Sequence, residues 1–149
     1  MHDAIRTLIQ GQHSCVLATS LDNRPHTSLM GFAPSEDCMT FFMATYRNTN
    51  KFANLQANPE VCLLVDNRAT QPGSNRLETM ALTVHGRVEI LHDPEQCRTV
   101  ADLLRRNLPH LRDFLAGEDI VLIAVRATNF LLLHGPTDAT YETVPPIDT

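Results

Sequence analysis

Three strand-length segments near the N-terminus are separated only by short polar turns, and this spacing constrains the fold more than any other feature of the sequence. Residues 14–20 and 25–33 flank the turn 21–24. A second turn, 34–37, leads to the aromatic segment 39–45. Turns of this length join antiparallel neighbours, because a parallel pair needs a crossover of a dozen or more residues. The sequence therefore predicts that its early strands are antiparallel.

Three more strands are predicted further along the chain. Residues 61–65 form a continuous apolar run, and Met80–Ile90 alternates apolar with polar side chains. Gly86 interrupts this alternation, which indicates a bulge or a close approach of two backbones. The last strand, Ile120–His134, is long, and we expect it to bend near residues 128–129.

Helical spacing connects these strands at residues 3–11, 49–57 and 94–108. Six strands with a few covering helices predict a mainly β protein, a small antiparallel barrel in a single domain of 149 residues, with residues 135–149 as a C-terminal tail. No glycine-rich turn joins a strand to a helix, which excludes the Rossmann and P-loop nucleotide sites.

Charge and cysteine usage exclude several functional classes. The 12 basic and 17 acidic residues give a net charge of −5, with no basic run longer than Arg105-Arg106, so a nucleic-acid partner is not expected. No apolar run approaches the ~20 residues of a membrane span, and no secretion signal precedes the first helix. We therefore expect a soluble cytoplasmic protein. The four cysteines are spread along the chain with no CxxC pair, so we expect no metal site.

Residues 44–51 concentrate polar groups where a predicted strand meets a predicted helix. The segment contains two hydroxyls, two amides and two cations: Thr45, Thr49, Asn48, Asn50, Arg47 and Lys51, the only lysine of the chain. Hydroxyls, helix-start N–H groups and a point charge are what a phosphate monoester requires. A capped helix with a solvated Lys51 and Arg47 explains the same pattern, so the residues alone leave both interpretations open.

Several short motifs surround this segment in a fixed order. Ala18-Thr19 comes first and DNRPH at 22–26 follows. The order continues with 41–45, Lys51 with Asn54-Leu55, Asn58-Pro59 before Val61, and His85-Gly86-Arg87-Val88-Glu89. In this order they resemble the pyridoxamine 5′-phosphate oxidase-like family, the FMN-binding split barrels. The resemblance implies a six-stranded antiparallel split β-barrel.

The resemblance also implies a cofactor site. In this family FMN lies across the barrel strands at a homodimer interface, with its phosphate at the junction of the third strand and the following helix. The residues at the matching positions are His26, Ser28 and Met30 along the ribityl chain and ring, and Ala44, Thr45, Thr49, Asn50 and Lys51 around the phosphate. His26 and Asn50 stand where the vitamin B6 oxidases have arginines, and Arg47 is a candidate to replace the missing charge.

The departures from the vitamin B6 oxidases concern the substrate. The chain has no tryptophan, and residues 129–135 lack the Arg-x-His segment of those enzymes. Met80 or Ala81 stands in place of their flavin-contacting glutamine. We therefore expect an FMN-binding oxidoreductase that acts on a different small molecule, with no catalytic side chain identified. The alternatives are a flavoprotein for electron transfer or FMN storage, and a relative that binds deazaflavin F420 or haem, the last with His26 or His134 as the axial ligand.

Overall fold

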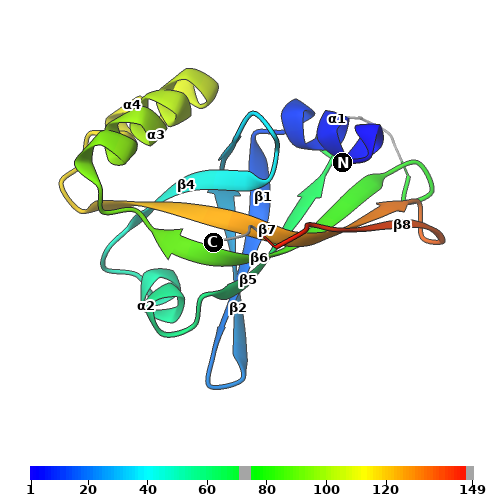
Figure 1. Cartoon of the computed structure of the whole chain (residues 1–149), viewed down its shortest axis with the longest axis horizontal. Helices are drawn as coiled ribbons and strands as arrows, with labels where there is room; N and C mark the ends of the chain where they lie inside the picture. Colours follow the sequence, from blue (N-terminus) through cyan, green and yellow to red (C-terminus); the bar gives the residue numbers. More distant parts are fainter. Residues whose placement is uncertain (71–74, 147–149) are drawn as a thin grey trace.

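Eight strands pair into one antiparallel sheet in the computed structural model, which describes residues 1–70 and 75–146 (Figure 1). The strands are β1 (Ser14–Leu21), β2 (Arg24–Gly31), β3 (Ala33–Pro34), β4 (Thr40–Tyr46), β5 (Glu60–Asp66), β6 (Met80–Ile90), β7 (Ile120–His134) and β8 (Asp138–Thr143). The helices are α1 (Asp3–Gly11), α2 (Asn50–Ala57), α3 (Pro94–Asn107), the 3-10 turn η1 (Pro109–Leu111) and α4 (Arg112–Leu115).

The sheet curls but does not close. Its strand order is β2-β1-β5-β6-β7-β4-β3, with β8 also paired to β7, and every pair is antiparallel. Strand β2 lies at one end of this order, and β4 and β3 lie at the other. Within the described residues β2 forms no ladder with β4 or β3, so a split separates them. The predicted class, a mainly β antiparallel split barrel with covering helices, is confirmed.

The predicted number of six strands is too low, for two reasons. Residues 25–33 were expected to be one strand, but β2 ends at Gly31 and β3 pairs with β4 instead of β1. The N–H of Phe32, which lies between them, bonds to the His13 carbonyl at 3.0 Å, so the chain turns away there. The tail supplies the other strand, β8. Its polar sequence carries no clear strand pattern, and it pairs with β7 along an edge that β4 leaves free.

Strand β7 holds the two halves of the barrel together. Its first half, up to Arg126, pairs with β4, and its second half, from Asn129, pairs with β8. Between them the register against β6 slips, so that Thr128 is an extra residue opposite the step from His85 to Gly86. This is the bend predicted near 128–129. A side chain on Gly86 would place its Cβ 2.6 Å from the Arg126 carbonyl oxygen, which confirms the predicted close approach.

Two apolar layers cover opposite faces of the sheet. Helices α1 and α2 contribute to the main core on the inner face, whose fully buried side chains include Ile5, Ile9, Leu17, Met43, Leu63, Leu82 and Phe130. The segment from α3 to α4 packs on the outer face of β4 and the first half of β7. Its buried residues Val100, Leu104, Leu108 and Leu115 form one cluster with Ala124 of β7. None of the helices in the described ranges is long and apolar enough to cross a membrane.

Thr49 and Asp93 cap the starts of α2 and α3. The hydroxyl of Thr49 accepts a bond from the Phe52 N–H, and the carboxylate of Asp93 accepts one from Gln96 N–H, with Pro94 in the first turn. Helix α2 ends at Asn58, ahead of Pro59, as the sequence predicts.

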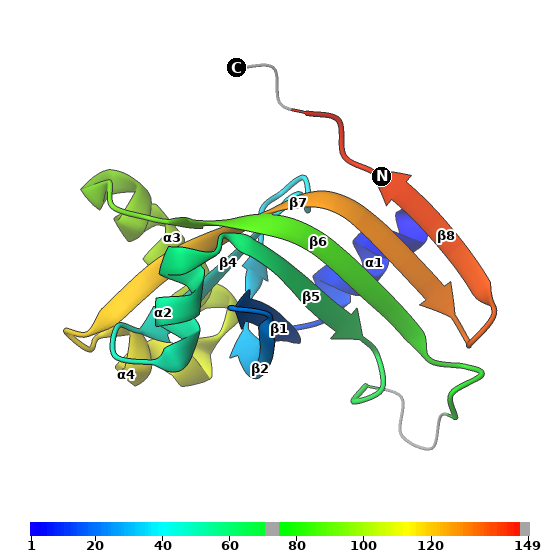
Figure 2. The same ribbon diagram turned by 90° about the horizontal axis from the view of Figure 1, so that it is seen from below.

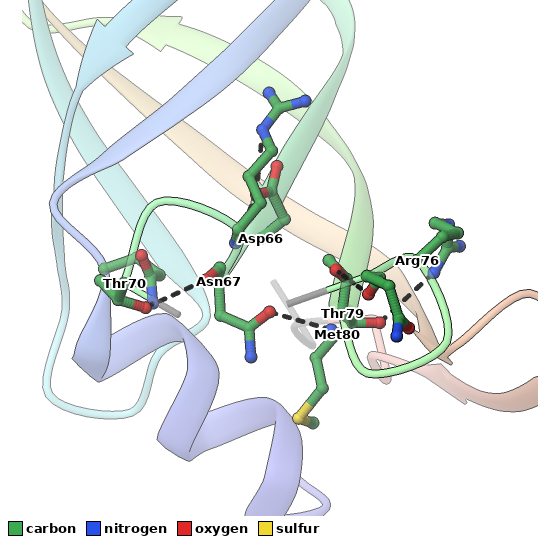
Figure 3. Close-up of polar contacts among 9 residues, drawn as sticks. Asp66, Asn67, Thr70, Arg76, Thr79 and Met80 are labelled. Atoms are coloured by element: carbon green, nitrogen blue, oxygen red, sulfur yellow. Dashed lines mark hydrogen bonds and ion pairs between the residues drawn. The ribbon is translucent and has the colours of Figure 1, made fainter. Parts of the chain in front are cut away.

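A buried amide ties the long β5–β6 connection to the sheet (Figure 3). The side chain of Asn67 is 6% exposed, and its Oδ1 accepts a hydrogen bond of 3.0 Å from Met80 N–H. Its backbone carbonyl accepts bonds from the N–H and the hydroxyl of Thr70, both at 3.1 Å. Nothing in the sequence marks Asn67, because one asparagine in a polar loop carries no local signal.

Replacing Asn67 by alanine should lower the free energy of unfolding by about 1–2 kcal/mol, because the Met80 N–H loses its partner away from water. Asn75→Ala is the matched control, since the Asn75 side chain accepts a 2.9 Å bond from Leu77 N–H in an exposed position where water can replace it. Urea denaturation followed by circular dichroism measures both. Equal losses in the two variants would contradict a special role for the buried amide.

Candidate functional site

A cavity of about 260 Å³ lies at the split of the barrel. Strands β2 and β4, the start of α2, and the segment from η1 to α4 surround it. It is lined by Leu29, Met30, Gly31, Ala44, Thr45, Tyr46, Thr49, Lys51, Leu111 and Phe114. We call it the β2–β4 cavity. Five of the eight predicted cofactor-binding residues line it, namely Met30, Ala44, Thr45, Thr49 and Lys51.

The hydroxyl of Thr45 has no hydrogen-bond partner in the described part of the chain, although it is fully buried. The residue is 2% exposed near the end of β4. A buried polar group without a partner costs about 1–3 kcal/mol, so such groups need an explanation. Its position on the wall of the β2–β4 cavity makes a bound ligand the natural partner for it.

Lys51 lies half-buried in the first turn of α2. Its ammonium donates to the Met30 sulfur at 3.1 Å, a weak acceptor, and no carboxylate in residues 1–70 or 75–146 forms an ion pair with it. Burial lowers the pKa of Lys51 below its usual value, because desolvation disfavours the charged form. An anion in the cavity would supply the opposite charge that pairs with this ammonium.

The hydroxyl of Thr49 is already occupied as a helix cap. It accepts from Phe52 N–H and donates to the Tyr46 carbonyl, both at 3.1 Å. Its proton is therefore committed to the protein in this structure. The first N–H groups of α2, at Asn50 and Lys51, have no intrahelical partner, as at any helix start.

Comparison with known families places this chain. The family model for pyridoxamine 5′-phosphate oxidase matches residues 1–129 of the 149. The chain belongs to the pyridoxamine 5′-phosphate oxidase family. None of the curated proteins compared with it matches.

Several solved structures have the same fold as this chain, although their sequence identity to it is low. General stress protein 26 from Bacillus anthracis is 20% identical with a TM-score of 0.70, and the match covers 95% of this chain and 97% of that chain. An FAD-binding protein from Mesorhizobium loti is 19% identical with a TM-score of 0.70, covering 87% and 91%. A haem-binding protein from Mycobacterium smegmatis is 14% identical with a TM-score of 0.81, covering 93% of this chain and 55% of that chain. The chain therefore spans about half the length of the last of these.

Three of the residues expected from the family resemblance do not line the cavity. The β1–β2 register puts His26 and Ser28 on the same face of β2 as Met30, but farther toward the turn of the hairpin, and His26 is exposed. Asn50 is exposed at the start of α2. Arg47, the candidate to replace the missing arginines, is exposed and lines a separate cleft instead of this cavity.

Sequence reasoning missed the wall that the C-terminal half contributes. Leu111 and Phe114 come from η1 and α4, and the Phe114 ring packs edge-on against Tyr46 with ring centroids 4.8 Å apart. Nothing near residue 111 in sequence indicates a ligand site, since these are ordinary apolar residues of an amphipathic segment. Only the packing of α4 beside the end of β4 brings them to the cavity.

Proposed function

We propose that this chain binds FMN, with the phosphate in the β2–β4 cavity, and acts as a flavin-dependent oxidoreductase on a small substrate. The observation that carries the proposal is the orphaned Thr45 hydroxyl on the cavity wall. Family membership supports a cofactor at this place, and the FAD-binding neighbour supports a flavin.

The donor set fits a phosphate monoester. Lys51 would contribute a point charge, Thr45 an unused hydroxyl and the start of α2 its free N–H groups. Apolar groups of Met30 and Ala44 would exclude water from these contacts. Bound FMN would supply the electron transfer, while the protein holds and orients it.

The size of the cavity supports a homodimeric site. Cavities for small molecules usually measure about 300–1,000 Å³, and the 260 Å³ of one chain is below that range. The phosphate end of FMN fits such a space, and the ring would then lie against a second copy of the chain. This agrees with the homodimer expected from the family resemblance.

An uncovered face of the sheet is suited to that second copy. Residues directly opposite one another on neighbouring strands project from the same face, and one row runs across six strands: Leu29, Val16, Leu64, Thr83, Leu131 and Tyr141. Leu29 is 78% exposed and Tyr141 64%. Figure 2 shows β5, β6, β7 and β8 as a curved band with α1 behind it. The other apolar members, Val16, Leu64 and Leu131, are partly exposed. A row of five apolar or aromatic side chains that solvent reaches is typical of an interface.

Pyridoxamine 5′-phosphate itself is not the substrate we propose. The chain lacks the tryptophan and the Arg-x-His segment that the vitamin B6 oxidases carry. The substrate is therefore left as a small redox partner of another class.

The absorption spectrum of the purified protein, loaded with FMN if necessary, tests the proposal. We expect an oxidised flavin spectrum that follows the dimer through size-exclusion chromatography with light scattering. A deazaflavin or haem spectrum, with no uptake of added FMN, would overturn the cofactor assignment. A monomer that retains FMN at micromolar concentration would overturn the shared site.

Thr45→Val provides a test with two readouts of opposite sign. The change removes the orphaned hydroxyl and keeps the shape, so the flavin-free protein should have an equal or higher free energy of unfolding, by up to about 1 kcal/mol. The same variant should bind FMN about tenfold more weakly, as measured by fluorescence quenching. A loss of stability in the flavin-free variant would mean that the hydroxyl bonds within the protein, and the proposal would lose its main support.

The affinity for FMN should fall as the pH rises through the pKa of Lys51. That pKa is lowered by burial in the flavin-free protein, so the ammonium deprotonates at a lower pH than an ordinary lysine. A phosphate favours the protonated form, and binding therefore weakens once the proton is lost. Titrations with riboflavin, which has the same ring and no phosphate, control for ionisation of the flavin. Parallel pH profiles for the two ligands would contradict the contact.

A further inference from the structure

A second cleft, of about 470 Å³, lies between α3 and the strand ends beside it. One wall is a helical stripe of α3 that includes Cys97, Arg98, Ala101, Asp102 and Arg105. The opposite side comes from the end of β6 and the start of β7. Figure 1 shows α3 and α4 together near the start of β7. This volume is within the range of small-molecule sites.

The cleft is separate from the β2–β4 cavity. The two share no lining residue, although Tyr46 lines the cavity and its neighbour Arg47 lines the cleft. In the same way, Phe114 lines the cavity and its neighbour Leu115 lines the cleft. The edge-on pair of Tyr46 and Phe114 belongs to the cavity side.

Three arginines from two segments of the chain line the cleft. Arg98 and Arg105 come from α3, and Arg47 comes from the β4–α2 connection, where its N–H bonds to the Asp119 carbonyl at 2.9 Å. The only carboxylate among the lining residues is Asp102, which pairs with Arg105 at 3.0 Å. No ion pair holds Arg47 or Arg98 within the described ranges. Two exposed arginines without an ion pair in the described residues thus line one cleft, in a chain whose net charge is −5.

Apolar side chains form the other part of the lining. They are Ile90, Leu91, Ile120, Val121 and Leu122, from the adjoining ends of β6 and β7. A ligand that satisfies both parts needs an anionic head for the guanidinium groups and a hydrocarbon or aromatic body for the apolar side. Guanidinium groups bind planar carboxylates through paired hydrogen bonds.

We propose that this cleft binds a small organic acid, with its carboxylate between Arg47 and Arg98 and its apolar body against the ends of β6 and β7. The proposal concerns a different cavity from the flavin site and does not depend on FMN binding. Arg47 belongs to the connection that carries Thr49 and Lys51, so the acid would bind next to the segment that we assign to the phosphate.

Titration of the purified protein with 4-phenylbutyrate, followed by methyl NMR, tests the proposal. We expect saturable shifts of the methyl groups of Ile90, Ile120 and Leu122. The neutral analogue 4-phenylbutanol should bind at least about tenfold more weakly, since it lacks the charged head. Equal affinity for the acid and the alcohol would overturn the proposal, as would shifts confined to Leu29, Met30 and Leu111 of the β2–β4 cavity.

Arginine variants show whether 4-phenylbutyrate contacts Arg47 and Arg98 or responds only to the overall charge of the protein. The double variant Arg47→Gln/Arg98→Gln should weaken 4-phenylbutyrate at least about tenfold. Arg106→Gln is the matched control, because this exposed arginine lies on the same helix and does not line the cleft. It should leave the affinity unchanged. An equal loss in the control and the double variant would overturn the assignment of the site.

Discussion

Replacing Lys51 by alanine should weaken FMN binding by about tenfold to hundredfold. A charge-assisted contact of this kind contributes about 1.5–3 kcal/mol, and Lys51 has no carboxylate partner in the described residues that could share its charge. Isothermal titration calorimetry on the flavin-free protein measures the loss. The fold should be retained, because the one hydrogen bond of the ammonium within the described residues goes to the Met30 sulfur, a weak acceptor.

Riboflavin separates a phosphate contact from a structural role of Lys51. It lacks the phosphate, so the wild type and Lys51→Ala should bind it with nearly equal affinity. Lys51→Arg should lose less FMN affinity than alanine but not match the wild type, since a planar fork does not replace a compact ammonium at a fixed depth. If Lys51→Ala weakens both ligands equally, the phosphate assignment fails.

Gly86→Ala should lower the free energy of unfolding by about 3 kcal/mol, or roughly 6–12 °C in Tm. The new Cβ would lie 2.6 Å from the Arg126 carbonyl oxygen and 2.9 Å from a Val125 methyl group. Because the closest atom belongs to the backbone of β7, the two central strands must separate to admit it. This is the place where the register slips by one residue, so the close approach is part of how β7 bends.

Gly11→Ala is the control for the general effect of adding a methyl group at a glycine. Gly11 ends α1, and a Cβ there meets nothing within 4 Å. Alanine loses less backbone entropy on folding, so this variant should be neutral or more stable by up to about 0.5–1 kcal/mol. Thermal and urea denaturation of both variants give the comparison. If Gly86→Ala proved as stable as Gly11→Ala, β6 and β7 would not be in the close contact described here.

Much of the fold could be predicted because its signals are local. The β1–β2 turn is too short for anything but an antiparallel pair, and the alternation of Met80–Ile90 gave the inner and outer faces of β6. The limits of β7 at Ile120–His134 also agree with the prediction. Strand β8 could not be predicted in this way, because its strand conformation depends on the free edge of β7 and not on its own polar sequence.

The candidate site also has a part that local sequence indicates and a part that depends on tertiary contacts. Thr45, Thr49 and Lys51 lie within seven residues of one strand–helix junction, so the sequence could indicate a phosphate-binding segment. Met30 was assigned through the family resemblance, and its contact with Lys51 is a tertiary one. Arg47 is a candidate for the same phosphate by sequence, yet in the structure it lines the other cleft.

The sequence by itself determined the antiparallel sheet, the helix starts and the polar junction, because each depends on side chains a few residues apart. Only the tertiary structure decided which of these groups have partners. It buried the Thr45 hydroxyl with no hydrogen-bond partner among residues 1–70 and 75–146. It also committed the Thr49 hydroxyl to the helix cap and brought Phe114 against Tyr46. Whether a polar group is satisfied depends on everything that surrounds it in space, and those neighbours come from distant parts of the chain.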